Sequence, residues 1–278
     1  MGRIKTFVLM LALMLIFMWV GGLIGGESGM RIAFWLAVIM NFLSYFFSDK
    51  IVLKQYKAQE VNAASAPELY EIVQKLADRA RLDMPKLYII CEKVPNAFAT
   101  GRNPSHAAVA VTQGLLELMD RQEIEGVLAH EMSHIKHYDI LTSSIAAVFA
   151  GAIGMLSNTA RYQTSSGQNS RPKGLSLIIG TILMPIAATI IRFSISRTRE
   201  YAADAGSAKL TGHPEWLISA LEKLEVYSKK SVMKNATNET AHMFIINPLA
   251  STKFASLFST HPATKDRIKR LENMTREI

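Results

Sequence analysis

Two histidines and a glutamate stand within five residues of one another and form the strongest chemical pattern in the sequence. They are His130, Glu131 and His134, in the run His-Glu-Met-Ser-His. Apolar residues around this run recur at helical spacing, so the two histidines lie on the same face of a helix. Neutral imidazole is a good zinc ligand, and a catalytic zinc site leaves one position open for water. The pattern predicts that His130 and His134 bind one zinc ion.

Glu131 is the candidate catalytic residue of this pattern. On a helix it is rotated by about 100° from His130, so it faces a water beside the ion rather than the ion itself. Zinc lowers the pKa of such a water to about 7, and a nearby carboxylate can take its proton and later return it to a leaving amine. The pattern predicts a zinc hydrolase with Glu131 as general base. The alternative, two surface histidines near an incidental glutamate, explains the amphipathic helix less well.

A third protein ligand must come from elsewhere in the chain, and the candidates are acids and one more histidine. His137 lies a further turn beyond His134, too distant to join the same ion easily. Glu200 and Asp204 form an i, i+4 pair on an expected helix, and could supply a ligand carboxylate and a second carboxylate that holds a ligand imidazole. Spacing alone does not select Glu200, which could equally be a surface acid. The other acids considered are Asp139, Glu215, Glu222 and Glu225.

The composition indicates that part of the chain lies in lipid. Hydrophobic residues make up 49% and charged residues only 19%, against about 25% in ordinary soluble domains. This balance excludes a disordered chain. The single cysteine, Cys91, excludes an intramolecular disulfide and a cysteine-based zinc site. The net charge of +8 does not indicate nucleic acid, because the basic residues cluster beside apolar stretches, where anionic lipid headgroups account for them.

Four apolar stretches reach the length of about 17 residues that a membrane-spanning helix needs. The first is too long for the core of a cleaved signal peptide and is expected to be a retained anchor. The last two contain several hydroxyl residues and a proline, and could instead form a buried helical hairpin of a soluble core. The stretches are residues 6–26, 32–48, 140–160 and 174–191.

Basic residues flank the ends of the first, second and fourth stretches and predict the orientation of the chain. They place both termini and residues 49–139 in the cytoplasm, although the loop between the last two stretches is also basic. His134 and Glu200 can share an ion only if an even number of crossings separates them. We therefore expect a cytoplasmic zinc site close to the membrane. The expected organisation is two transmembrane helices (1–48), two parts of one peptidase domain (49–139 and 192–278), and a hydrophobic hairpin, expected to form two further transmembrane helices, between those parts (140–191).

The water-facing segments predict a mainly α fold with a small antiparallel β-sheet. A capping box at Ser65 and Glu68 opens a helix that runs to about Arg81. Runs rich in β-branched and small residues predict three strands, at 87–91, 96–101 and 107–111. Further helices are expected at 115–119, 121–138, 196–210, 214–227 and 262–274.

The motifs together resemble those of the HtpX-type membrane zinc metallopeptidases, relatives of the CAAX prenyl proteases. The likeness rests on residues 130–134 followed by Asp139, on residues 199–204, on residues 95–101, and on Thr260-His261-Pro262 followed by Asp266-Arg267-Ile268. It covers nearly the whole chain and implies a zincin-like peptidase domain, with Glu200 as the third zinc ligand and Glu131 as the base. It also implies one zinc ion per chain, a place in the cell inner membrane, and damaged or misfolded membrane proteins as substrates under stress.

Substrate binding is expected along an edge strand. By the resemblance, residues 95–101 form that strand, and a peptide that pairs with Asn96, Ala97 and Phe98 would bind with little sequence preference. His261 could hydrogen-bond the oxyanion or the substrate, or could simply cap the following helix. Two other functions remain as alternatives: a membrane scaffold with a structural metal, and a zinc hydrolase of lipid-modified peptides. The few apolar stretches disfavour the large chamber that the latter needs.

Overall fold

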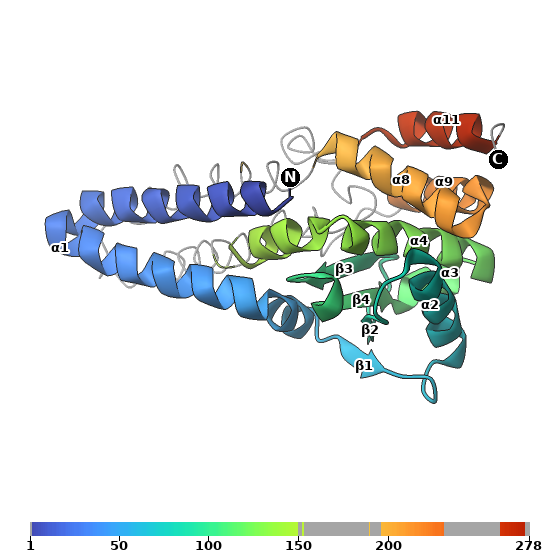
Figure 1. Cartoon of the computed structure of the whole chain (residues 1–278), viewed down its shortest axis with the longest axis horizontal. Coiled ribbons are helices and arrows are strands. Elements are labelled where there is room, and N and C mark those ends of the chain that lie inside the picture. The colour runs from blue at the N-terminus through green and yellow to red at the C-terminus, as the bar shows by residue number, and fades with distance from the viewer. Residues whose placement is uncertain (1, 150–151, 153–188, 190–195, 231–261, 276–278) are drawn as a thin grey trace.

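A helical hairpin projects from a domain of helices packed around a small sheet (Figure 1). The computed structural model describes residues 2–149, 152, 189, 196–230 and 262–275. The hairpin is α1 (Gly2–Gln55), which is bent at Gly25 and Gly26, where the backbone leaves the helical region. Gly26 has a φ of 58° and a ψ of −143°, a conformation open in practice only to glycine. The bend therefore turns one apolar run into two antiparallel helices.

The two arms of α1 are each long and apolar enough to cross a membrane. These arms are Thr6–Leu23 and Gly25–Gln55, and they correspond to the two expected N-terminal spans. Of the third expected span, the helix Asp139–Phe149 is described and packs on the first arm of α1, where the Thr6 and Thr142 hydroxyl oxygens lie 2.8 Å apart. The rest of residues 140–191, apart from two single positions, lies outside the described residues.

The sheet has four strands in the order β1-β2-β4-β3. They are β1 (Gln59–Val61), β2 (Lys86–Ile90), β3 (Ala97–Gly101) and β4 (Ala107–Thr112). The expectation of an antiparallel sheet is wrong at its centre, because β2 and β4 pair in parallel. After β2 the chain crosses to the far edge to form β3, and a short 3₁₀ turn (Pro104–His106) returns it as β4 between them. β3 is thereby left at the edge of the sheet.

The helix after β1 begins differently from the predicted capping box. Helix α2 (Pro67–Ala80) has Ala66 as its N-cap, with no side-chain cap bond. The Ser65 hydroxyl instead accepts a hydrogen bond from the Asn62 N–H at 2.9 Å. Pro67 at the first helical position needs no cap for its nitrogen, which carries no hydrogen. A complete capping box exists one element later, between Asp120 and Glu123 at the start of α4 (Arg121–Lys136).

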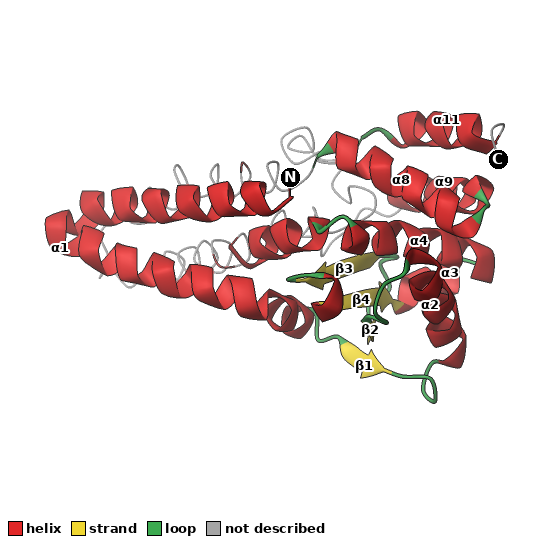
Figure 2. Ribbon diagram, viewed as in Figure 1, coloured by secondary structure: helices red, strands yellow, loops and turns green. Residues whose placement is uncertain are grey.

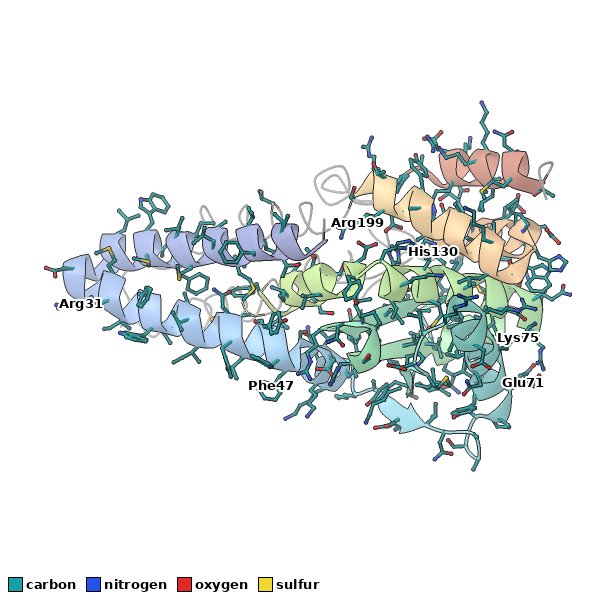
Figure 3. All side chains as sticks on the ribbon, in the orientation of Figure 1. Arg31, Phe47, Glu71, Lys75, His130 and Arg199 are labelled. Atoms are coloured by element: carbon teal, nitrogen blue, oxygen red, sulfur yellow. The ribbon has the colours of Figure 1, made fainter. Side chains whose placement is uncertain are left out.

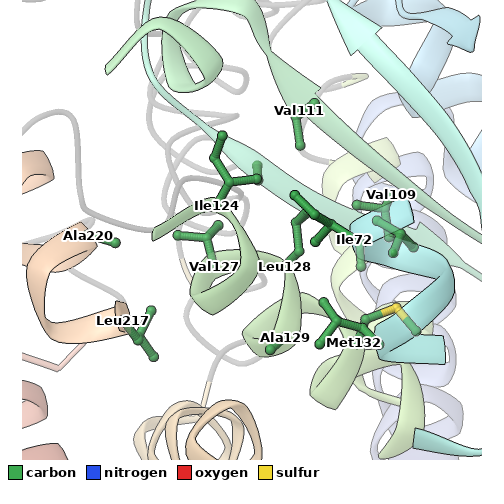
Figure 4. Packing of buried hydrophobic residues seen from close by; sticks show 14 of the residues in the cluster. Ile72, Val109, Val111, Ile124, Val127, Leu128, Ala129, Met132, Leu217 and Ala220 are labelled. Atoms are coloured by element: carbon green, nitrogen blue, oxygen red, sulfur yellow. The ribbon is translucent and has the colours of Figure 1, made fainter. Parts of the chain in front are cut away.

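Helix α4 is the centre of the domain. The sheet and α2 cover one side of it, and α8 (Arg197–Thr211) and α9 (Pro214–Lys230) cover the other (Figure 2). Val127, Leu128 and Met132 of α4 are fully buried among side chains of α2, β4 and α9 (Figure 4). Short α3 (Gln113–Leu118) links β4 to α4, and α11 (Thr264–Thr275) packs on α8 and α9. The result is a rigid helix that carries the histidines.

Candidate metal centre

Helices α4 and α8 bring His130, His134 and Glu200 together. The Nε2 atoms of the two histidines lie 3.2 Å apart. The Glu200 carboxylate faces both, with Oε1 3.5 Å from His134 Nε2 and Oε2 3.8 Å from His130 Nε2. One ligand atom from each of the three residues fits within 4.8 Å of the other two. The sequence analysis expected these same three residues, although Glu200 stands far from the two histidines in the chain.

The carboxylates beside the two imidazoles favour a cation between their Nε2 atoms. Nδ1 of His130 lies 3.0 Å from Asp204 Oδ1, and Nδ1 of His134 lies 3.3 Å from Asp139 Oδ2. A hydrogen on each Nδ1 would face a carboxylate and leave a lone pair on each Nε2, although at His130 Nδ1 the geometry falls outside that of a hydrogen bond. Two lone pairs at 3.2 Å repel unless a proton or a metal lies between them. Two nitrogens on one tetrahedral zinc stand roughly 3.3 Å apart, so the donor set fits this ion.

The charges around His134 also favour a cation at this site. Burial on its own lowers the pKa of His134, but the hydrogen bond to Asp139 and the charges of Glu200 and Glu131 outweigh it. The pKa of His134 is thereby raised to about 9. The site favours positive charge at the point where the three ligand atoms converge.

Asp204 holds His130 and is itself held by a buried arginine. Arg267 of α11 is 1% exposed and donates two hydrogen bonds to Asp204, at 2.9 and 2.6 Å. Burial on its own would raise the pKa of Asp204, but Arg267 and His130 overcome it and hold that pKa at about 2. Asp204 therefore stays ionised, and its role beside a ligand imidazole is the one that the i, i+4 spacing suggests.

Asp139 does the same for His134. Arg199 donates a hydrogen bond to Asp139 Oδ1 at 3.0 Å, while Oδ2 of the same carboxylate faces His134. Burial opposes ionisation of Asp139, but His134 and Arg199 lower its pKa overall. Asp139 thus contacts one of the expected ligands, and its hydrogen bond to Arg199 joins α8 to the start of the helix Asp139–Phe149.

Glu131 lies on the sheet side of the histidines. It is 6% exposed, and its Oε2 accepts a hydrogen bond from the Ala99 N–H of β3 at 2.9 Å. Burial raises the pKa of Glu131, against the lowering effect of the two histidines. A carboxylate with a raised pKa, fixed by one backbone bond, is suited to taking and returning a proton.

Comparison with known proteins identifies the family. The model of "Peptidase family M48" matches residues 63–275, which include the whole metal centre. The chain belongs to peptidase family M48. Its curated relatives include the "Protease HtpX homolog" of Campylobacter hominis, 60% identical over 100% of both chains. The protein of the same description from Sulfurovum sp. is 54% identical over 98% of this chain and 99% of that one.

A solved structure extends the likeness to the fold. The crystal structure of S. mikatae Ste24p aligns with 97% of this chain at a TM-score of 0.51 and 20% identity. This chain covers 65% of the length of Ste24p, and the likeness concerns the fold alone. The family, the relatives and the apolar hairpin identify this M48 peptidase as a membrane zinc metalloprotease that acts on polypeptides.

Of the expected substrate residues of this M48 peptidase, Ala97 and Phe98 lie on β3 and Asn96 directly precedes it, and they do not face the same way. The backbone of Asn96 turns toward β4, since its carbonyl accepts a hydrogen bond from the Thr112 N–H at 2.8 Å. Phe98 points to the opposite face of the sheet and packs on Tyr56, with ring centroids 5.3 Å apart. By the alternation of a strand, Ala97 shares the outward side of Ala99, whose N–H reaches Glu131. His261 lies outside the described residues.

Arg199 and Arg267 stand in motifs that carry the family resemblance, but sequence reasoning assigned a role to neither of them. Both are arginines that neutralise a carboxylate beside a ligand, from 60 and 63 residues away in the chain. One feature of the sequence could have indicated the role of Arg267: it stands on the buried face of a predicted amphipathic helix. His137, by contrast, lies where expected: its Nδ1 is 2.8 Å from the Ser133 carbonyl oxygen, away from the ligand cluster.

Proposed function

We propose that this peptidase is a zinc endopeptidase in which His130, His134 and Glu200 hold one zinc ion per chain. Glu131 is its general base, and Asp204 orients His130. The observation that carries the proposal is the 3.2 Å approach of two imidazole Nε2 atoms in front of the Glu200 carboxylate. Glu131 stands beside this cluster without belonging to it, as a base must.

The chemistry divides between the ion and the chain. A zinc ion bound there supplies Lewis acidity that polarises a scissile carbonyl and makes a water easier to deprotonate. The Glu131 carboxylate takes the proton of the attacking water and passes it to the leaving amine. The Ala99 N–H keeps Glu131 in position. Asp204 and Asp139 keep the ligand imidazoles in the tautomer that presents Nε2.

Substrates of this enzyme are expected to be unfolded or damaged membrane proteins. An extended peptide can add along the outer edge of β3, where Ala97 turns its backbone outward, once it competes with the bonds that the Ala99 and Gly101 N–H groups make to Glu131 and Ser144. Pairing through backbone groups depends little on the sequence of the substrate, which suits an enzyme that removes misfolded chains. The helix Asp139–Phe149 starts at the residue that contacts His134, so the site lies beside an apolar element that extends the α1 hairpin.

The same arrangement supports a definite topology in the cell inner membrane. Lys50 and Lys54 lie in the last turns of the second arm of α1 and Lys57 follows it, while Glu27 and Arg31 lie in its first turns, near the bend. We expect the metal centre and both termini on the cytoplasmic side, with residues 49–139 and 192–278 forming one peptidase domain and 140–191 a membrane hairpin. Figure 3 locates Arg31 at the far tip of the α1 hairpin, away from that domain.

The catalytic proposal is tested by two substitutions with different consequences. Glu131→Gln keeps the volume and should keep the zinc while cleavage of casein falls by about 10²–10⁴-fold. Glu200→Ala should lose both zinc and cleavage. Metal analysis of the purified full chain distinguishes the two, and His137→Ala serves as the control that loses neither. Full cleavage by the Glu131→Gln enzyme contradicts the proposal.

The topology is tested with the cysteine that the chain already has. Cys91 is exposed on the peptidase domain. A membrane-impermeant maleimide should label it in inverted membrane vesicles and not in intact spheroplasts. The reverse pattern is expected for a Cys91→Ser variant that also carries Ser28→Cys near the tip of the hairpin. Labelling of Cys91 from outside contradicts the cytoplasmic site.

A further inference from the structure

A cavity of about 420 Å³ lies where the α1 hairpin meets the peptidase domain. Its volume is within the range of small-ligand sites. Its lining separates into an apolar wall (Phe7, Met10 and Leu141) and a polar rim (Tyr45, Arg102, Asn103 and Tyr138). None of these residues belongs to the metal centre, so the cavity needs an explanation of its own.

The cavity lies at the depth where a membrane changes from apolar to polar. Phe7 and Met10 stand at the beginning of the first arm of α1, and Tyr45 stands just before Asp49 and Lys50, where charged residues return. Tyrosine is enriched at this level of membrane proteins because its ring is apolar and its hydroxyl is not. Phe47, at the domain end of the hairpin, and Arg31, at the opposite tip, mark the two ends of the apolar band (Figure 3).

Arg102 gives the cavity a positive charge. It follows β3 directly, and its guanidinium carbon lies 5.7 Å from the centroid of the Phe46 ring on α1. It is half-buried, and within the described part of the chain no carboxylate lies at ion-pair distance from it. A cation held against aromatic and apolar groups at this depth attracts an anion that carries an apolar portion.

On the opposite side of the polar rim, one residue has a strained backbone conformation. Tyr138 lies in the turn after α4 with a φ of 61°, in the left-handed region that non-glycine residues seldom occupy. The turn directs the chain into the helix Asp139–Phe149, whose Leu141 lines the apolar wall. Such strain persists only where surrounding contacts maintain it, and it concentrates at ligand sites.

From this arrangement we infer that the cavity binds the headgroup of one anionic phospholipid. Its phosphate lies against Arg102 and Asn103, and the start of an acyl chain lies along Phe7, Met10 and Leu141. Inorganic phosphate shares the charge but cannot use the apolar wall. Because Tyr138 precedes Asp139, which contacts His134, a lipid bound here stabilises the junction between the membrane helices and the metal centre.

The test uses the full chain in detergent micelles that contain phosphatidylcholine, either alone or together with phosphatidylglycerol. Native mass spectrometry counts the phosphatidylglycerol that each chain retains. About one molecule should remain on the unaltered protein, and Arg102→Gln should lower its affinity by about fivefold or more, the effect of one basic residue near a membrane surface. Arg102→Lys should keep most of the affinity. Met10→Trp fills the apolar wall without changing charge and should also displace the lipid.

A matched control is available on the same helix end. Lys50 lies over the Phe47 ring at 5.7 Å, much as Arg102 lies over Phe46, but it does not line the cavity. Lys50→Gln should leave the retained lipid unchanged. Equal losses for Lys50→Gln and Arg102→Gln overturn the inference, since they indicate general attraction to anionic lipid. Full retention by both cavity variants, or displacement by inorganic phosphate as effective as by short-chain phosphatidylglycerol, overturns it as well.

Discussion

Arg267 and Asp204 form a buried ion pair that joins the C-terminal helix to the metal centre. Two hydrogen bonds of 2.9 and 2.6 Å connect them, and Asp204 in turn lies 3.0 Å from Nδ1 of His130. A ligand of the metal is therefore positioned by a carboxylate, and that carboxylate by a cation from α11. Arg267 lies in the first turn of α11, so the site draws on side chains from α4, α8 and α11.

The first prediction concerns this pair. Arg267→Met keeps the length of the side chain but leaves Asp204 buried without its cation, and loss of one partner of a buried pair costs about 3–5 kcal/mol of stability. The loosened Asp204 should also lower zinc affinity by about 10–100-fold. Thermal unfolding and zinc release to a chelator measure the two effects.

Arg270 supplies the control on the same helix. Its guanidinium lies 3.9 Å above the Tyr201 ring and is exposed, so Arg270→Ala should cost about 1 kcal/mol or less and leave zinc affinity unchanged. If both substitutions release zinc equally, α11 acts by packing and not through the Arg267–Asp204 pair.

The second prediction concerns pH and the metal-free protein. The pKa of His134 is raised from 6.5 to about 9, because Asp139, Glu200 and Glu131 outweigh its burial. A raised pKa means that the folded state binds the proton more tightly than the unfolded state. This contribution to stability is fully present below pH 6.5 and is lost as the pH rises through about 9. Unfolding temperatures of the chelator-treated protein across this range measure it.

Zinc and one substitution provide the controls for that prediction. A bound zinc ion takes the place of the proton, so the zinc-loaded protein should not lose stability over the same range. In the metal-free protein, Asp139→Asn removes one of the anions that favour the proton and should bring the loss to lower pH. An equal loss with and without zinc contradicts the assignment.

Local patterns predicted much of the metal centre. Four-residue spacing placed His130 beside His134, and the same spacing paired Glu200 with Asp204, so each pair follows from helix geometry alone. The choice of Glu200 over other acids needed the resemblance to a family. The helices α2 and α9 were predicted well because their apolar periodicity is clear, whereas α4, buried on nearly every side, was predicted from its histidine motif and the apolar residues around it.

The sequence did not predict which distant strands and side chains pair with one another. Strand composition indicates that β2 and β4 exist but not which neighbours they pair with, and their parallel pairing depends on where β3 is placed. Arg199 and Arg267 find their carboxylates 60 and 63 residues away, with no spacing rule to connect them. The capping box expected at Ser65 failed because Pro67 and Asn62 offer a competing local solution.

The third prediction concerns the approach of the two arms of α1. A Cβ on Gly29 would collide with the backbone carbonyl oxygen of Gly21, which cannot move without separating the arms. Gly29→Ala should therefore lower stability by about 1–3 kcal/mol, seen as a fall in unfolding temperature in detergent. Gly22→Ala is the control, because its nearest neighbour would lie 3.9 Å away. Equal behaviour of the two variants contradicts close packing at the bend.

The final prediction concerns the junction between β3 and the helix Asp139–Phe149. The Ser144 hydroxyl accepts a hydrogen bond from the Gly101 N–H at 3.2 Å, lies 2.7 Å from the Thr100 hydroxyl, and donates to the Ile140 carbonyl at 2.7 Å. Ser144→Ala leaves two buried polar groups of β3 without this partner, and each such group costs about 1–3 kcal/mol. We expect a clear fall in unfolding temperature and faster amide exchange at Gly101.

The neighbouring Ser143 makes the comparison specific. Its hydroxyl only bonds the Asp139 carbonyl of its own helix, at 3.4 Å, so Ser143→Ala should change stability by less than about 0.5 kcal/mol. If Gly101 exchanges at the same rate in both variants, Ser144 does not hold the end of the edge strand. If only Ser144→Ala speeds that exchange, the strand that carries Ala97 and Ala99 is anchored at its far end by the apolar helix that follows the metal centre.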